Sequence, residues 1–159
     1  MNVGFYNNVF ENTITNNCYG IYLVPGYLLG CSFNTFYQNN INNNTYGIFA
    51  GDDLGSVIRN VFSRNNIMYN SEGITFSVYE SGPWYTTITR NTISYNNLIG
   101  NTNTYTFEYS LFNRCIGNYW GKSRLLPYPL TGKLRIFDYI IPWITFDWHP
   151  AQEPYDTGG

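Results

Sequence analysis

The sequence is poor in charged residues, and this excludes several classes of protein. Only 11% of the 159 residues are Asp, Glu, Lys or Arg, whereas an average soluble protein has about 25%. The formal net charge is −2 and the lysines and arginines form no basic run, so we expect no nucleic-acid partner. No run of 18 apolar residues occurs, and we therefore expect no transmembrane segment.

Cysteine is scarce and shows no metal-binding spacing. The three cysteines are Cys18, Cys31 and Cys115, and none of them forms a CxxC pair. Cys18 and Cys31 are close enough in sequence to form a disulfide, and small buried thiols are the more ordinary alternative. Cys115 with the only histidine, His149, would be a conceivable catalytic pair, but the repeat described below places Cys115 in the core.

The single histidine also limits metal chemistry. His149 with Asp147, Glu153 and Asp156 could hold a metal ion, but copper and zinc sites usually use more His or Cys ligands. We interpret His149 instead as a locally hydrogen-bonded residue of the C-terminal tail. No hydrolase, nucleotide-binding or zinc-protease motif is present. The sequence therefore predicts no catalytic residue, no metal site and no cofactor.

The chain is rich in asparagine, which recurs in a fixed frame. The copy Asn34 to Gly47 has Asn, an apolar residue two positions later, then Asn, Ile, Asn and Gly at positions five, seven, ten and thirteen. Copies start at Asn7, Asn34, Asn60, Asn91 and Asn113. A period of this length indicates a solenoid. Apolar spacing of two, with Asn and Gly at the corners, favours short strands over helices.

Alignment of the copies predicts four apolar columns inside the solenoid. The columns are Val9, Phe36, Phe62, Ile93, Cys115; Ile14, Ile41, Ile67, Leu98, Trp120; Ile21, Ile48, Ile74, Tyr105; and Leu23, Ala50, Phe76, Phe107. Strand alternation places other aromatic side chains outside. The candidates for exposure are Tyr6, Tyr22, Tyr37, Phe49, Tyr69, Tyr79, Trp84, Tyr85 and Tyr95.

The asparagines form columns of their own, which we interpret as structural. Asn tolerates the left-handed backbone of a tight corner, and stacked amides can hydrogen-bond from coil to coil. The predicted ladder residues are Asn12, Asn39, Asn65, Asn96, Asn118 and Asn17, Asn44, Asn70, Asn101.

The frame NxFxxNxIxxNxxGI resembles the repeat of right-handed parallel β-helix proteins of the pectate-lyase-like superfamily. The segment GNYWG at 117–121 is similar to the ending of secreted archaeal and bacterial β-helix surface proteins, and also to periplasmic accessory proteins of nitrous oxide reductase maturation. The resemblance covers about residues 5–120. It implies secretion and, often, contact with polysaccharide. Enzymes of the family carry clustered Asp with basic partners on one strand face, and this sequence lacks that pattern.

We therefore expect an all-β chain: a single-stranded right-handed parallel β-helix of about five coils over residues 1–120, with a C-terminal cap or extension at 121–159. Residues 121–133 read as a connection, and residues 134–148, divided by Pro142, read as one or two edge strands. The first repeat starts by Asn7 without a cap or a signal peptide before it. We expect from this a mature or excised segment of a longer protein.

Function is expected in the parts of the chain that do not repeat. Residues 24–33, 51–59 and 77–90 read as loops of different length on one edge, where solenoids often bind partners. The candidate carbohydrate-binding or partner-binding residues are Tyr79, Glu80, Trp84, Tyr85, Asp52 and Asp53. Asp52 and Asp53 could also bind Ca²⁺, although a solvated turn is the simpler interpretation.

The sequence favours a non-catalytic protein of the cell surface or the extracellular space. We expect it to bind polysaccharide, or to associate with copies of itself or with a neighbouring surface protein. The first alternative is a polysaccharide lyase or hydrolase with its acidic residues in the loops. The second is an accessory protein that delivers a metal.

Overall fold

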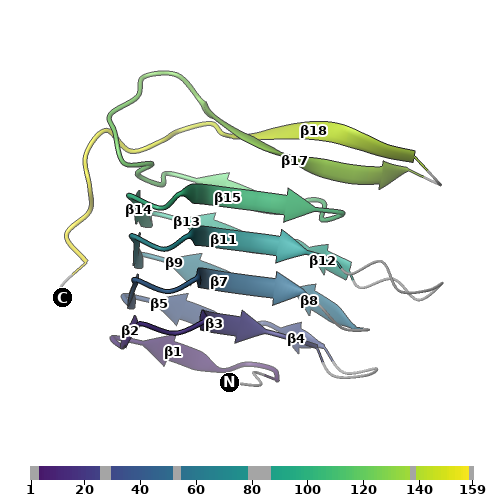
Figure 1. Ribbon diagram of the computed structural model, residues 1–159, viewed down its shortest axis with the longest axis horizontal. Coiled ribbons are helices and arrows are strands. Elements are labelled where there is room, and N and C mark those ends of the chain that lie inside the picture. Colours follow the sequence, from purple (N-terminus) through teal and green to yellow (C-terminus); the bar gives the residue numbers. More distant parts are fainter. Residues whose placement is uncertain (1–3, 26–29, 52–54, 79–86, 137–138, 158–159) are drawn as a thin grey trace.

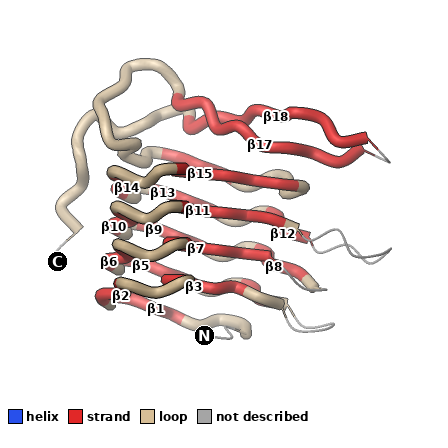
Figure 2. Tube along the Cα trace, viewed as in Figure 1, coloured by secondary structure: helices blue, strands red, loops and turns tan. Residues whose placement is uncertain are grey.

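The computed structural model describes residues 4–25, 30–51, 55–78, 87–136 and 139–157, and in these residues it contains strands and turns but no helix. The strands stack as a parallel β-solenoid of about four turns (Figures 1 and 2). The predicted all-β parallel fold is thus confirmed, although the expected number of about five coils is slightly too high. The fifth copy of the frame supplies only one full strand, β16, and isolated bridges at Leu111 and Tyr119.

Each turn contributes to four sheets, which we number in the order of the frame. Sheet 1 holds β1 (Asn8–Phe10), β5 (Thr35–Tyr37), β9 (Val61–Ser63), β13 (Thr92–Ser94) and β16 (Arg114–Ile116). Sheet 2 holds β2 (Thr13–Thr15), β6 (Asn40–Asn42), β10 (Asn66–Met68) and β14 (Asn97–Ile99). Sheet 3 holds β3 (Tyr19–Leu23), β7 (Tyr46–Gly51), β11 (Glu72–Ser77), β15 (Asn103–Glu108), β17 (Tyr128–Ile136) and β18 (Tyr139–Asp147). Sheet 4 holds β4 (Cys31–Ser32), β8 (Ser56–Ile58) and β12 (Thr87–Thr89).

The strand register confirms the four predicted apolar columns. Phe36 pairs with Val9 and Phe62, and Ile41 pairs with Ile14 and Ile67. The stacked side chains fill the interior, where the rings of Phe36 and Phe62 lie parallel with their centroids 5.0 Å apart. Both phenylalanines are fully buried. The period-two pattern was therefore enough to identify most of the core.

Sheet 4 was not predicted, because the segments at 24–33, 51–59 and 77–90 were interpreted as loops throughout. The end of each segment instead forms a strand of two or three residues, and these strands add the buried column Cys31, Val57, Ile88. Each of these residues lies three positions before a frame asparagine. So short a strand shows no alternation of its own, and only alignment of the repeats could have revealed it.

The asparagines form three hydrogen-bonded ladders. In the middle ladder, the backbone N–H and the Nδ2 of Asn39 both donate to Oδ1 of Asn65, each over 3.0 Å. Asn65 Nδ2 donates in turn to the carbonyl of Phe36 in the coil before it, over 3.0 Å. Both predicted columns are confirmed. The first residues of each frame make a third ladder of the same kind, which comprises Asn7, Asn34, Asn60, Asn91 and Asn113.

The position of the left-handed corner residue was predicted wrongly. It is the residue before each ladder asparagine that has positive φ, for example Gln38 at 53°, Arg64 at 54° and Tyr95 at 57°. The ladder asparagine has to direct its own N–H at the next coil, so the chain turns one residue earlier. The corner side chain then lies outside the ladder, where its type is not restricted by the interior.

The glycine of the frame is required for close approach. A Cβ at Gly47 would lie 2.6 Å from the carbonyl oxygen of Gly73 in the next coil. The backbones of successive coils meet there without room for a side chain, which explains why the frame keeps glycine at this corner.

The C-terminal residues cover the last coil. Residues 128–133, expected to be part of a connection, belong to β17, which runs parallel to β15 and antiparallel to β18. Pro142 does not divide the second strand, because β18 is the edge of the sheet and tolerates a missing donor. The tail then descends beside sheet 2 (Figure 1), where Tyr155 and Asn97 exchange two hydrogen bonds of 2.8 Å.

Candidate functional site

The loop residues that the sequence singled out lie outside the described part of the chain. This applies to Asp52 and Asp53 and to Tyr79, Glu80, Trp84 and Tyr85. Their assignment as binding residues therefore stays a prediction, and the site must be sought on the described surfaces.

Asp147 does not serve a metal site. Its carboxylate is fully buried and accepts hydrogen bonds from the backbone N–H groups of Gly117, Asn118 and His149, over 3.0, 2.9 and 3.2 Å. Asn118 Nδ2 and Trp120 Nε1 also donate to it, over 3.1 and 3.0 Å. Five donors thus hold this carboxylate at the end of the middle ladder. No group of three His, Cys, Asp or Glu side chains suited to a metal occurs among the described residues, so the possible cluster around His149 is not formed there.

The two buried cysteines, Cys31 and Cys115, provide no ready nucleophile. All three are free, and the disulfide left open between Cys18 and Cys31 is absent; Cys31 Sγ donates instead to the carbonyl of Val24 over 3.4 Å. Burial, and secondarily the charge of Asp147, raise the pKa of the Cys115 thiol far above its ordinary value, although a hydrogen bond with Tyr105 opposes the shift. Because the thiolate is the reactive form, Cys115 is an inert core residue, as the sequence predicted.

An aromatic cluster lies on the outer face of sheet 3, at its N-terminal end. We define the aromatic patch as Tyr19, Tyr22, Tyr46 and Phe49. Strands β3 and β7 place Tyr19 opposite Tyr46 and Tyr22 opposite Phe49. The ring of Tyr19 stacks on those of Tyr22 and Tyr46 with centroids 4.4 and 5.1 Å apart, and Phe49 contacts Tyr19 and Tyr46 edge-on at 5.5 and 5.3 Å. All four side chains are half-buried, so they form a rigid surface that still contacts solvent.

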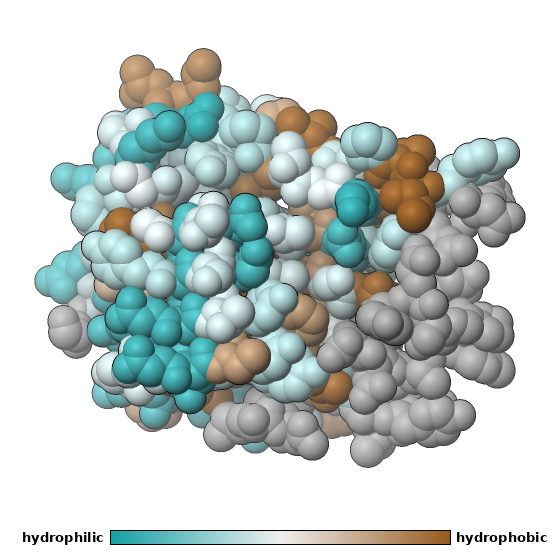
Figure 3. Space-filling view, in the orientation of Figure 1, coloured by the Kyte–Doolittle hydropathy of each residue, from teal (hydrophilic) through white to brown (hydrophobic). Residues whose placement is uncertain are grey.

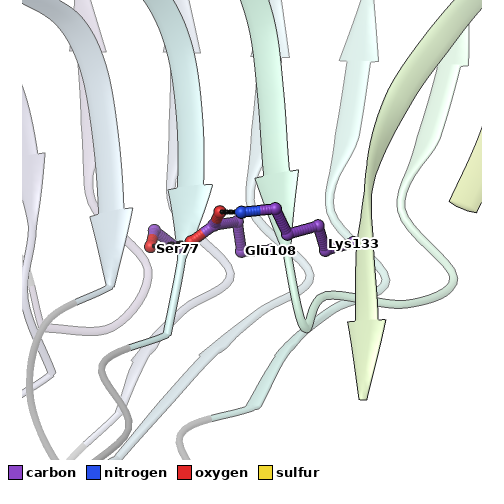
Figure 4. Close-up of polar contacts among 3 residues, drawn as sticks. All are labelled: Ser77, Glu108 and Lys133. Carbon is purple, nitrogen blue, oxygen red and sulfur yellow. Dashed lines mark hydrogen bonds and ion pairs between the residues drawn. The ribbon is translucent and has the colours of Figure 1, made fainter. Parts of the chain in front are cut away.

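In the later coils, the positions of sheet 3 that align with Tyr19 and Tyr46 carry polar residues. Glu72 and Asn103 follow Tyr19 and Tyr46 in register, and Asn103 Nδ2 donates to Glu72 Oε1 over 2.6 Å. Near the strand ends, Glu108 accepts from Ser77 Oγ over 3.3 Å and from Lys133 Nζ over 3.0 Å (Figure 4). These three side chains project from β11, β15 and β17. The outer face of sheet 3 therefore offers aromatic rings at one end and fixed hydrogen-bonding groups at the other.

The sequence identified half of the aromatic patch. Tyr22 and Phe49 were among the aromatics expected outside, whereas Tyr19 and Tyr46 were missed. Both missed tyrosines directly precede the frame glycine, and this shared position was the available signal. Of the other described candidates, Tyr6, Tyr69 and Tyr95 are exposed and Tyr37 is half-buried.

The chain matches no known protein family, no curated protein and no solved structure. Within the described residues there is no helix of the length and apolarity needed to cross a membrane, which agrees with the sequence prediction. The fold and the surface chemistry are therefore the only basis for a functional proposal.

Proposed function

We propose that the chain is a non-catalytic scaffold of the cell surface or extracellular space that binds polysaccharide on the outer face of sheet 3. The observation that carries this proposal is the aromatic patch. In the next two coils, Glu72 and Asn103 occupy the positions that align with Tyr19 and Tyr46 and supply hydrogen-bonding groups. We further propose that the repeat places the chain among pectate-lyase-like β-helix proteins, near the secreted archaeal and bacterial surface members.

The patch has the chemistry that sugar rings require. A sugar has apolar C–H faces that pack on aromatic rings, while its hydroxyl groups need hydrogen-bonding partners. The stacked rings already hold one another in place, so little side-chain freedom is lost on binding. The ladder of Asn17, Asn44, Asn70 and Asn101, at the corner that leads into sheet 3, also holds successive coils together, as a preorganised binding surface demands.

Removal of two rings tests the proposal. A Tyr22→Ala/Tyr46→Ala variant and the unaltered chain are compared by affinity electrophoresis in gels that contain soluble xylan, mannan or β-glucan. We expect retardation by at least one glycan, and a loss of about tenfold in affinity in the variant. The matched control is Tyr69→Ala, because Tyr69 is an exposed tyrosine on a corner beyond sheet 2. No retardation by any glycan, or an equal loss in the control, would overturn the proposal, and release of sugar products would overturn its non-catalytic part.

Self-association is a second candidate function, and the exposed edge strand β18 favours it. Tyr139, Trp143 and Ile144 are 74, 45 and 48% exposed. Seen from the side of Figure 1, hydrophobic atoms gather at the upper right, in the region of β17 and β18 (Figure 3). Pro142 removes one donor from this edge and so limits strand pairing. Light scattering tests self-association. A dimer that the Trp143→Lys substitution converts into monomers would support it, and a monomer at high protein concentration would exclude it.

A further inference from the structure

The loop that precedes β17 exposes two adjacent leucines. Leu125 and Leu126 are 93 and 70% exposed, and Leu125 has the highest exposed fraction of the large hydrophobic side chains in the described residues. We define the leucine loop as residues 121–127. It rises above the last coil in Figure 1, and hydrophobic atoms protrude in the same region of Figure 3. Both side chains project away from the core, so a contact outside the chain has to account for them.

The leucine loop is held in place by its own polar and aromatic side chains. Ser123 Oγ donates to Oε1 of Gln152 in the tail over 2.7 Å, and Gln152 Nε2 donates to the carbonyl of Arg124. The guanidinium of Arg124 lies 5.0 Å from the ring centroid of Tyr128, and that ring stacks on Trp120 at 4.4 Å. The leucines therefore project from an ordered loop, and binding through them costs little conformational entropy.

Two cations and a tryptophan adjoin the leucines. Lys122 and Arg124 are the charged residues of the leucine loop, and Lys122 is exposed. Asp147 pairs with Tyr128, so Trp148 lies where the loop joins β17. Because Asp147 points toward the last coil, strand alternation directs Trp148 to the opposite, outer face, where it is 64% exposed. This end of the solenoid thus combines apolar side chains, positive charge and an amphipathic ring.

We propose that the leucine loop docks the chain end-on to a lipid bilayer that contains anionic lipids. Leu125 and Leu126 enter the boundary between headgroups and acyl chains. Trp148 lies at the level of the headgroups, which its amphipathic ring favours. Lys122 and Arg124 contact the lipid phosphates. The aromatic patch lies in the first two coils, at the other end of the solenoid, and stays free.

The protruding shape of the leucine loop favours a bilayer over other partners. A bilayer is fluid and needs no complementary cavity, whereas a small ligand needs a concave site. A stable protein interface buries about 800 Å² on each partner, far more than two leucines and one tryptophan supply. A few apolar side chains beside cations are enough for reversible attachment to an anionic membrane surface.

The test compares two double variants that each remove an exposed apolar pair. Leu125→Ser/Leu126→Ser alters the leucine loop. Leu111→Ser/Phe112→Ser is the matched control, because these side chains are 40 and 79% exposed. They follow the end of β15, whereas the leucine loop precedes β17, which runs parallel to β15, and so lies near the start of these strands. After equal melting temperatures have shown that both variants fold, each is sedimented with vesicles of phosphatidylcholine alone or of equal parts phosphatidylcholine and phosphatidylglycerol.

We expect the unaltered chain to bind the vesicles with phosphatidylglycerol and to bind the neutral ones more weakly. The loop variant should bind at least about tenfold more weakly, and the control should change by less than about threefold. Lys122→Gln/Arg124→Gln should remove the preference for anionic vesicles, as should added salt. The Tyr22→Ala/Tyr46→Ala variant should bind vesicles like the unaltered chain, so the glycan and membrane proposals fail separately.

Three results would overturn the proposal. The first is no sedimentation with either kind of vesicle, and the second is an equal loss in the loop variant and the control. The third is a dimer in light scattering without vesicles that Leu125→Ser/Leu126→Ser converts into monomers, because the leucines would then contact a second copy of the chain.

Discussion

The two ends of the middle amide ladder differ, and the difference shows that the ladder has a direction. Every rung donates from one asparagine to the Oδ1 of the asparagine in the next coil. At the C-terminal end, Asn118 therefore needs an acceptor, and buried Asp147 supplies a group that only accepts. At the N-terminal end, Asn12 is exposed, and its Oδ1 receives no hydrogen bond from the described residues. A carboxylate can thus close one end of the ladder, whereas the other end is suited to donors.

The largest effect is expected at the closed end. Asp147→Ala leaves the donors of Gly117, Asn118 and Trp120 buried without an acceptor, and we expect a loss of about 4 kcal/mol in the free energy of unfolding. Asp147→Asn keeps one acceptor oxygen and should cost about 2 kcal/mol. Urea denaturation measures both. If Asp147→Ala costs under about 1 kcal/mol, Asp147 does not close the ladder.

A smaller effect is expected within the ladder, and the smallest at its open end. Asn65→Ala removes one rung from the buried centre and should cost about 3 kcal/mol, since its neighbours lose both a donor and an acceptor. Asn12→Ala removes an exposed rung and should cost less than about 1 kcal/mol. Urea midpoints at equal m-values give the comparison. Equal losses at Asn65 and Asn12 would contradict the contrast between the ends.

Addition of a coil tests the open end directly. A copy of residues 34–59 fused before Asn7 should place a new set of ladder donors against Asn7, Asn12 and Asn17. We expect the melting temperature to rise by several degrees, because neighbouring coils stabilise each other. The control carries Ala at the three ladder positions of the added coil. A rise of the same size in the control would show that the amides contribute nothing to the new interface.

The cysteines allow a further comparison of the first and last coils. It measures the rate of thiol labelling, and we expect little or no effect on stability. Cys18 in the first coil is exposed, whereas Cys115 in the last is buried. At pH 8 we expect iodoacetamide to label Cys18 quickly and Cys115 only after denaturation, as mass spectrometry would show. Rapid labelling of Cys115 in the folded chain would mean that the last coil opens.

The same thiol predicts a dependence of stability on pH. Burial raises the pKa of Cys115 above its ordinary value of 9.0. The folded thiol therefore keeps its proton where the unfolded one loses it, and the stabilisation is complete below pH 9 and declines as the pH rises above that value. A Cys115→Ala variant should lack this part of the decline in urea titrations between pH 8 and 10.

More of the fold than of the candidate site could be predicted from the sequence. Phe36, Phe62 and the ladder asparagines repeat at a fixed spacing, so alignment of the copies determined both the core and the strand register. Sheet 4 was not predicted, because strands of two or three residues, such as the one around Val57, are too short to show alternation of apolar and polar side chains. The first part of strand β17 was not predicted, because Pro129 and Gly132 are residues typical of a connection. The structure shows that Gly132 lies inside the strand, where the close approach of Phe107 leaves no room for a side chain.

The sequence by itself determined most of the interior of this protein. Each interior position recurs in several coils, and a column of like residues identifies its own neighbours. Only the tertiary structure decided which outer residues meet and how the ladder ends. Asp147 reaches Asn118 from 29 residues away, and Tyr155 reaches Asn97 from 58 residues away. Asp147 and Tyr155 lie outside the repeated frame, so no periodicity in the chain predicts these contacts.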